Sequence, residues 1–234
     1  MTGVVAGVGL AGALATGATP AASASAPQSA QNLYREAIAS TKSWSVHYAS
    51  SSTQADQTLL VSGDAGPASG SQTVTLGTGS ISILVIGGIT YLKGNASGLE
   101  NLAGLNASQA AQTAGQWIEF ATANAAFAPV VAGVRSHDVA DELALKGTLS
   151  LGHPRTLDGY AVEAVEGAQT LNRKTLHVVL YVRARGSHVP VEEDSVDAKG
   201  RPTSAEHVTY SEWGELIRPE APHATVSIGP ISAV

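Results

Sequence analysis

The stretch between residues 71 and 93, SQTVTLGTGSISILVIGGITYLK, decides the fold class, because three strand patterns alternate in it with two glycine-rich turns. The strand patterns are rich in β-branched residues, and a glycine pair between two such runs is a strong signal for a tight hairpin. In chain order the patterns and turns are Ser71–Leu76, Gly77–Gly79, Ser80–Ile86, Gly87–Gly88 and Ile89–Lys93. Parallel strands need a crossover of a dozen or more residues, so turns this short predict an antiparallel meander.

The chain on either side of this meander consists of further strand patterns and a central block of helical patterns. Apolar residues at helical spacing predict four helices, at Gln28–Ser43, Leu99–Ala114, Ala123–Val134 and Ser136–Leu145. Alternating or β-branched runs predict the other strands, at Trp44–Tyr48, Asp56–Ser62, Gln116–Phe120, Lys146–Leu151, Gly159–Val165, Thr175–Arg183, Val189–Val196 and Ala205–Tyr210. This order predicts an α+β fold with one antiparallel sheet, as a single domain spanning about residues 30–228.

The N-terminal segment, residues 1–26, is typical of a targeting sequence. Residues 1–30 carry no charged side chain, and a short apolar run from Val4 to Leu14 is followed by small residues up to Ala26. This pattern predicts a secretory signal peptide, with an uncleaved N-terminal anchor as the alternative. We therefore expect an exported protein, extracellular or in the cell envelope. The GxGxxG match at Gly7–Gly12 lies in this segment and is not placed between a strand and a helix, so it predicts no nucleotide site.

Composition excludes several classes of function. The chain has 234 residues, no cysteine, 13 basic and 19 acidic residues, and a formal net charge of −6. Without cysteine there is no disulfide, no thiolate metal site and no thiol catalysis. Without a basic cluster, nucleic acid is not an expected partner.

No residues are predicted to be catalytic, and neither a metal site nor a cofactor is expected. The sequence has no GxSxG, Walker, HExxH or EF-hand motif, and its seven histidines are scattered singly. The acidic run Glu192–Asp194 could hold a cation only weakly, and we interpret it as a solvated hairpin. The sequence therefore does not predict an enzyme.

Four segments carry a resemblance to a known family: Tyr91–Gly94, Gly115–Ile118, Leu176–Pro190, and Tyr210–Gly214 followed by Pro219 and Pro222. In this order they resemble the LolA/LppX-type lipoproteins of actinobacteria (the LppX/LprG type). The resemblance implies a curved antiparallel half-barrel sheet with helices packed on its concave face, and an apolar cavity between them. It also implies a carrier of lipid acyl chains, because better-known relatives move such chains across the envelope. Those relatives are usually tethered through a lipidated cysteine, which this chain lacks.

The resulting hypothesis is an exported envelope protein that binds a lipid or another hydrophobic ligand, with lipid transport as one role. The alternative is a non-enzymatic interaction module whose interior is filled. Envelope proteins and peripheral contact with a membrane are further expected partners. The apolar residues expected to line the cavity are Trp44, Val46, Tyr48, Ile81, Ile83, Val85, Leu102, Phe127, Val131, Val178 and Leu180.

Overall fold

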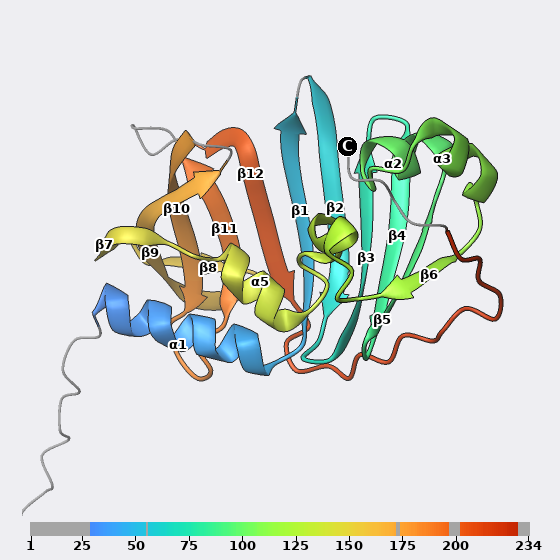
Figure 1. The fold of residues 1–234 in the computed structure, drawn as a ribbon. Coiled ribbons are helices and arrows are strands. Elements are labelled where there is room, and N and C mark those ends of the chain that lie inside the picture. The colour runs from blue at the N-terminus through green and yellow to red at the C-terminus, as the bar shows by residue number, and fades with distance from the viewer. Residues whose placement is uncertain (1–28, 55, 172–173, 197–201, 229–234) are drawn as a thin grey trace, which may run out of the picture.

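A single large antiparallel sheet dominates the structure (Figure 1). The structure is a computed structural model of the chain and describes residues 29–54, 56–171, 174–196 and 202–228. The strands follow the order β6-β5-β4-β3-β2-β1-β12-β11-β10-β9-β7, and β8 pairs with β9. Their bounds are β1 Val46–Gln54, β2 Gln57–Ala65, β3 Ser69–Leu76, β4 Gly79–Ile86, β5 Ile89–Gly94, β6 Ile118–Ala121, β7 Lys146–Leu151, β8 Arg155–Leu157, β9 Tyr160–Leu171, β10 Lys174–Arg183, β11 Pro190–Val196 and β12 Pro202–Ser211.

The sheet curves without closing into a barrel, and the helices lie on its concave face (Figure 1). The helices are α1 Ala30–Ser43, α2 Ala96–Asn101, α3 Ala107–Thr113, the 3₁₀ turn η1 Ala125–Phe127, α4 Ala128–Val131 and α5 Ser136–Glu142. Helices α1 and α5 cover the strands at one end of the sheet, and α2 and α3 cover those at the other (Figure 1). The predicted half-barrel is confirmed.

Helix α1 is the longest helix among the described residues, and its sequence explains its position. The Ser29 side chain accepts a hydrogen bond from the Asn32 amide at 3.2 Å and so caps the N-terminus. Leu33, Ala37 and Thr41 are buried, and their four-residue spacing places them on one face of the helix. This face packs against the concave side of the sheet.

Two predicted helices are corrected by the structure. The segment Leu99–Ala114 forms two short helices, because Gly104 has a positive φ of 73° and Asn106 starts α3 with a capping box. The segment Ala123–Val134 forms only η1 and the single-turn α4. The backbone leaves the helical range at Ala132, which has a ψ of 140°, and Gly133 follows with a φ of 79°. Strand β8 was not predicted from the sequence.

The concave face divides into two halves with separate cores. The filled half comprises β3–β6 with α2, α3, η1 and α4, and one cluster of buried apolar residues occupies it. The open half comprises β1, β2 and β9–β12 with α1 and α5, and it holds a second cluster around Leu33, Leu143 and Leu180. A third cluster, on the convex side of β9–β11, is built around Val179 and Tyr181.

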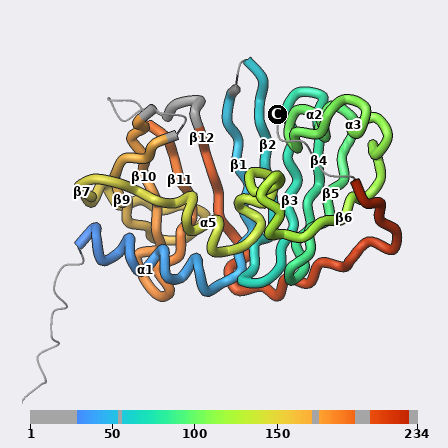
Figure 2. Tube along the Cα trace, viewed as in Figure 1, coloured from blue at the N-terminus to red at the C-terminus, as the bar shows by residue number. Residues whose placement is uncertain are grey.

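The C-terminal arm, residues 212–228, leaves β12 and runs past the ends of the strands to β6 (Figure 2). There the Val226 amide donates to the Trp117 carbonyl at 2.8 Å, and the Glu119 amide donates to the Val226 carbonyl at 3.1 Å. The expected targeting segment, residues 1–26, lies outside the described residues. In the part of the chain that the structure describes, no helix is both long and apolar enough to span a membrane.

Candidate functional site

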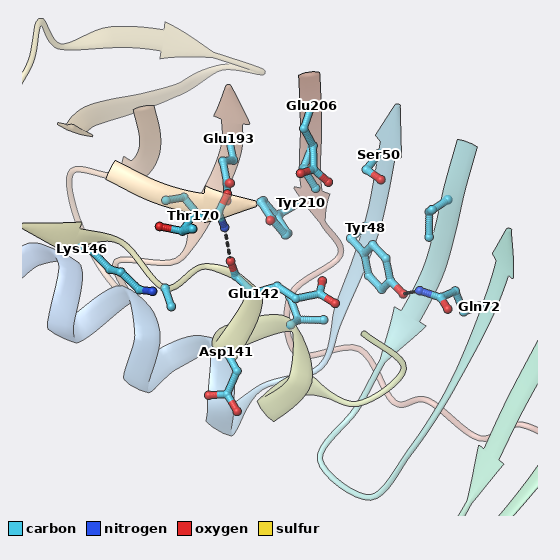
Figure 3. Close-up of a pocket in the computed structure, with 15 residues that line it drawn as sticks. Tyr48, Ser50, Gln72, Asp141, Glu142, Lys146, Thr170, Glu193, Glu206 and Tyr210 are labelled. Atoms are coloured by element: carbon cyan, nitrogen blue, oxygen red, sulfur yellow. Dashed lines mark hydrogen bonds between the residues drawn. The ribbon is translucent and has the colours of Figure 1, made fainter. Parts of the chain in front are cut away.

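A cavity of about 470 Å³ lies in the open half, between the concave strands and the end of α5 (Figure 3). Its walls come from α5, from β1, β2, β3, β7, β9, β11 and β12, and from the segment that joins α5 to β7. The lining residues are Tyr48, Ser50, Val61, Gln72, Val139, Asp141, Glu142, Ala144, Lys146, Gln169, Thr170, Glu193, Glu206, Val208 and Tyr210. We call this space the concave cavity.

Three glutamates from separate elements meet in the concave cavity (Figure 3). Glu193 comes from β11, Glu206 from β12, and Glu142 from the last turn of α5. The strand register pairs Glu193 with Leu180 and with Val208, so that its side chain points to the concave face with theirs. Only 5% of Glu193 is exposed.

Burial and mutual repulsion raise the pKa values of these carboxyl groups. Burial, followed by the charges of Glu206 and Glu142, raises the pKa of Glu193 to about 8. Desolvation by the surrounding protein, followed by the charges of Glu206 and Asp138, raises the pKa of Glu142 to about 7. The Glu142 side chain nevertheless stays accessible from the cavity. Burial also raises the pKa of Glu206. The cluster can therefore hold and exchange protons near neutral pH.

Two tyrosines complete the polar wall. Tyr48 on β1 and Tyr210 on β12 are register partners, so they lie side by side on the concave face. The Tyr48 hydroxyl accepts a hydrogen bond from Gln72 Nε2 at 2.7 Å (Figure 3), and Tyr210 donates one to the Glu193 carboxyl. Burial raises the pKa of both phenols, so both stay protonated at neutral pH and can act as donors.

The remaining wall is mixed. Val61, Val139, Ala144 and Val208 present aliphatic surface to the same space. The other lining residues are polar or charged: Ser50, Gln72, Asp141, Lys146, Gln169 and Thr170. Such a site suits a ligand that has both an apolar part and a hydrogen-bonding part.

The structure distributes the eleven sequence-predicted residues over several environments. Tyr48 lines the concave cavity, and Val46 lines a second cavity described below. Trp44 caps the C-terminus of α1 and is 42% exposed. Val178 and Leu180 are fully buried in β10. The others belong to the apolar cluster of the filled half or pack against it: Ile81, Ile83, Val85, Leu102, Phe127 and Val131. Whether any of them binds a ligand stays a prediction.

The glutamates were missed by the sequence analysis. The acidic run Glu192–Asp194 is not a solvated hairpin throughout, because Glu193 is buried among concave side chains. One signal was present for Glu206, since it alternates with Val208 and Tyr210 and so shares a face with two apolar residues. A charged residue on an otherwise apolar face of a strand is a candidate functional residue.

Comparison with known proteins shows the fold. No family model matches the sequence, and no curated protein is significantly similar to it in sequence. LprF from Mycobacterium bovis is similar in structure, with a TM-score of 0.55 and 14% identity, over 82% of this chain and 96% of that one. The chain has a LolA/LppX-like fold.

Two further solved structures show lower similarity to this LolA/LppX-like chain. The lipoprotein LppX from Mycobacterium tuberculosis has a TM-score of 0.45 at 15% identity, over 81% of this chain and 97% of that one. A LolA superfamily protein from Nitrosomonas europaea has a TM-score of 0.30 at 15% identity, over 82% and 96% of the two chains. At such identities the likeness concerns the fold alone.

Proposed function

We propose that this protein is an exported, non-catalytic binding protein of the cell envelope, which holds a lipid or another amphiphilic molecule in the concave cavity. The observation that carries the proposal is the cavity itself, which the second apolar cluster leaves unfilled between the concave strands of the open half and the end of α5. A volume of about 470 Å³ lies within the range of small-molecule sites. The fold shared with LprF is compatible with the same proposal, because it is the half-barrel that the resemblance in sequence implies.

The lining of the concave cavity defines the chemistry of this ligand. Aliphatic side chains such as Val61 and Val208 favour an acyl chain or another apolar group, which gains free energy by leaving water. Above about pH 8, where the carboxyl groups of Glu142, Glu193 and Glu206 are ionised, they only accept hydrogen bonds and favour a group that donates them, whereas a protonated Glu193 can also donate one. Hydroxyl-rich or amine-bearing headgroups meet this requirement, whereas a free fatty-acid carboxylate would be repelled above neutral pH.

The filled half supports one alternative function. There the concave face is covered by packed apolar side chains, as expected for an interaction module whose interior has no room for a ligand. Such a protein would act through its outer surface on another envelope component. It would purify without lipid, which separates it from a carrier.

A cavity-filling substitution tests the proposed ligand. The exported protein is purified, and its bound lipid is identified by organic extraction and native mass spectrometry. We expect Val61→Trp to reduce the bound lipid at least several-fold, because the indole would occupy the concave cavity. Leu60→Trp is the matched control and should leave the lipid content unchanged, since Leu60 is on the opposite face of β2 and 50% exposed.

Two results would contradict the proposal that the protein binds a lipid in the concave cavity. One is the absence of co-purifying lipid together with no uptake of a fluorescent amphiphile by the purified protein. The other is equal lipid content in the Val61→Trp and Leu60→Trp variants when both show the wild-type circular dichroism spectrum. Either result would favour the interaction module.

A further inference from the structure

A second cavity, of about 340 Å³, lies where the C-terminal arm passes β1 and β2. We call it the arm cavity. Three of its lining residues, His47, Asp64 and Ser71, are register partners on neighbouring strands and face away from the side that Tyr48 occupies. The arm supplies the other wall, with Glu212, Glu215, Leu216, Ile217, Arg218 and Pro219. This site is therefore separate from the concave cavity.

The arm cavity brings together three side chains that commonly bind metal ions. His47 Nδ1 lies 2.7 Å from Asp64 Oδ1, and ligand atoms of His47, Asp64 and Glu212 all lie within 4.8 Å of one another. Two ligand atoms bonded to one tetrahedral Zn²⁺ lie about 3.4 Å apart, given bond lengths of about 2.0–2.2 Å. Side-chain rotations that move these atoms by about 1 Å would therefore allow all three to bind one ion.

Hydrogen bonds from neighbouring side chains and backbone groups hold these three ligands in place. Ser71 Oγ donates a hydrogen bond to Asp64 Oδ2 at 3.2 Å, which orients the carboxylate from behind. The Gly214 amide donates to the Ser45 carbonyl at 2.9 Å, and Ser45 Oγ donates to the Glu215 carbonyl. These bonds fix the start of the arm beside β1, so that Glu212 is presented to His47 and Asp64 by a constrained backbone.

The formal charges of the arm cavity match a divalent cation. Asp64, Glu212 and Glu215 contribute three carboxyl groups, and Arg218 is the one lysine or arginine among the residues that line it. With a neutral imidazole the lining has a formal charge of two negative units. One imidazole nitrogen with carboxylate oxygens is a donor set that suits Zn²⁺ and similar borderline transition-metal ions, rather than the all-oxygen preference of Ca²⁺ or Mg²⁺.

We propose that His47, Asp64 and Glu212 bind a divalent transition-metal ion of the zinc type, and that this ion fastens the C-terminal arm to β1 and β2. Such a site was not predicted from the sequence, because its ligands come from two strands and from the arm, which are separated in the chain. The ion would replace the hydrogen bond between His47 and Asp64 and add a link to Glu212. The arm would then be held at both ends, by the ion at Glu212 and by the Val226 hydrogen bonds at β6.

A second cluster on the convex face provides a natural control. Glu192, Asp194 and His207 also bring ligand atoms within 4.8 Å, and His207 Nδ1 lies 2.7 Å from Asp194 Oδ1. At this cluster the positive charge of Arg155 acts on the Glu192 carboxylate, so a cationic side chain already lies nearby. None of these three residues lines the arm cavity. A generic affinity of His–carboxylate pairs for metal would appear at both clusters, although Arg155 would weaken it at this one.

The test is calorimetric titration of the full chain with Zn²⁺ after removal of metal by a chelator. We expect one tightly bound ion per chain, an affinity weakened by about tenfold or more in both His47→Ala and Glu212→Gln, and no change in His207→Ala. Glu212→Gln replaces a residue of the arm outside the sheet, so it tests the site even where His47→Ala affects folding. Absence of tight binding, or a loss caused by His207→Ala and not by Glu212→Gln, would overturn the proposal.

Hydrogen exchange supplies the readout for the fastening role. Zn²⁺ should slow amide exchange across residues 212–219 in the wild-type chain and in His207→Ala, and should leave it unchanged in Glu212→Gln. An ion that binds tightly without slowing exchange in this segment would refute the fastening role. Neither measurement depends on a lipid ligand, so both are independent of the function proposed for the concave cavity.

Discussion

The two halves of the concave face are made from strands of the same sheet, yet one is filled and the other encloses a cavity. A single row of register partners crosses both halves, running through Leu92, Ile83, Gln72, Gly63, Tyr48 and Tyr210. In β4 and β5 of the filled half the row is aliphatic. It becomes polar at Gln72, where the Gln72–Tyr48 hydrogen bond marks the border with the open half.

The comparison shows that backbone register alone does not decide whether a curved sheet is filled. Gly63 has no side chain, and a Cβ at this position would meet Tyr48 Oη at 2.8 Å and the Ser71 carbonyl oxygen at 2.5 Å. The missing side chain lets the Tyr48 ring lie over the strand. Beyond it, glutamates take the positions where the filled half has aliphatic residues. A polar-lined space of this size can hold water, whereas an empty apolar one would be costly.

The largest effect is expected from a substitution in the filled half. Phe127 is 1% exposed and stacks on Phe120 with ring centroids 3.9 Å apart, inside the apolar cluster. Phe127→Ala should lower the free energy of unfolding by about 3–5 kcal/mol, through lost burial and the void left behind. Urea denaturation measures this change.

Ile89→Ala is the control for this substitution, because Ile89 belongs to β5 in the same half but is 39% exposed. It should change the free energy of unfolding by about 0.5 kcal/mol or less. A cost below about 1 kcal/mol for Phe127→Ala would mean that the filled half can collapse around a large deletion. The contrast between the two halves would then be lost.

The second effect concerns the open half and depends on pH. The pKa of Glu193 rises from 4.5 to about 8 in the folded protein, so between these values the folded state holds a proton that the unfolded state has released. The stability of the wild-type chain should therefore fall as the pH rises through this window. Glu193→Gln removes the carboxyl group, so the stability of the variant relative to wild type should increase as the pH rises. We expect this difference in the free energy of unfolding to grow by an amount on the order of 3 kcal/mol between pH 5 and pH 8.

Urea denaturation at pH 5 and pH 8 provides the measurement. Glu100→Gln makes the same chemical change on an exposed position of α2, and it should have a small effect of similar size at both pH values. If Glu193→Gln and wild type show parallel pH dependence, the Glu193 carboxyl does not lose its charge on folding. The surroundings of Glu193 in the open half would then hold more water than the burial of this residue indicates.

The filled half could largely be predicted from sequence, because its strands carry their own turn signals. The glycine turns around Gly77 and Gly87 set the meander, and its β-branched runs are buried where alternation places them. The helices were less predictable. Apolar spacing suggested one helix from Leu99 to Ala114, but the positive φ of Gly104 and the Asn106 cap divide it.

The candidate site could not be predicted in the same way, because it depends on which face each strand residue occupies. The pairing of β11 with β10 shifts register between Tyr181 and Val182 of β10, and its pairing with β12 shifts between Asp194 and Val196 of β11. Such shifts change which residues point inward, so alternation alone did not place Glu193 inside. Glu142 was less predictable still, since it reaches the cavity from a helix end rather than from a strand.

The smallest effect tests the border between the halves. Tyr48→Phe removes the hydroxyl that accepts from Gln72 Nε2, and Gln72 is only 9% exposed. In a dry interior the orphaned amide would cost up to about 3 kcal/mol, whereas water in the concave cavity would replace the lost acceptor and limit the cost to about 1 kcal/mol. We expect the smaller value in urea denaturation, with Tyr160→Phe on an exposed part of β9 as control. A cost near the upper figure would show that water does not reach Gln72, and that the border of the filled half lies further toward Tyr210.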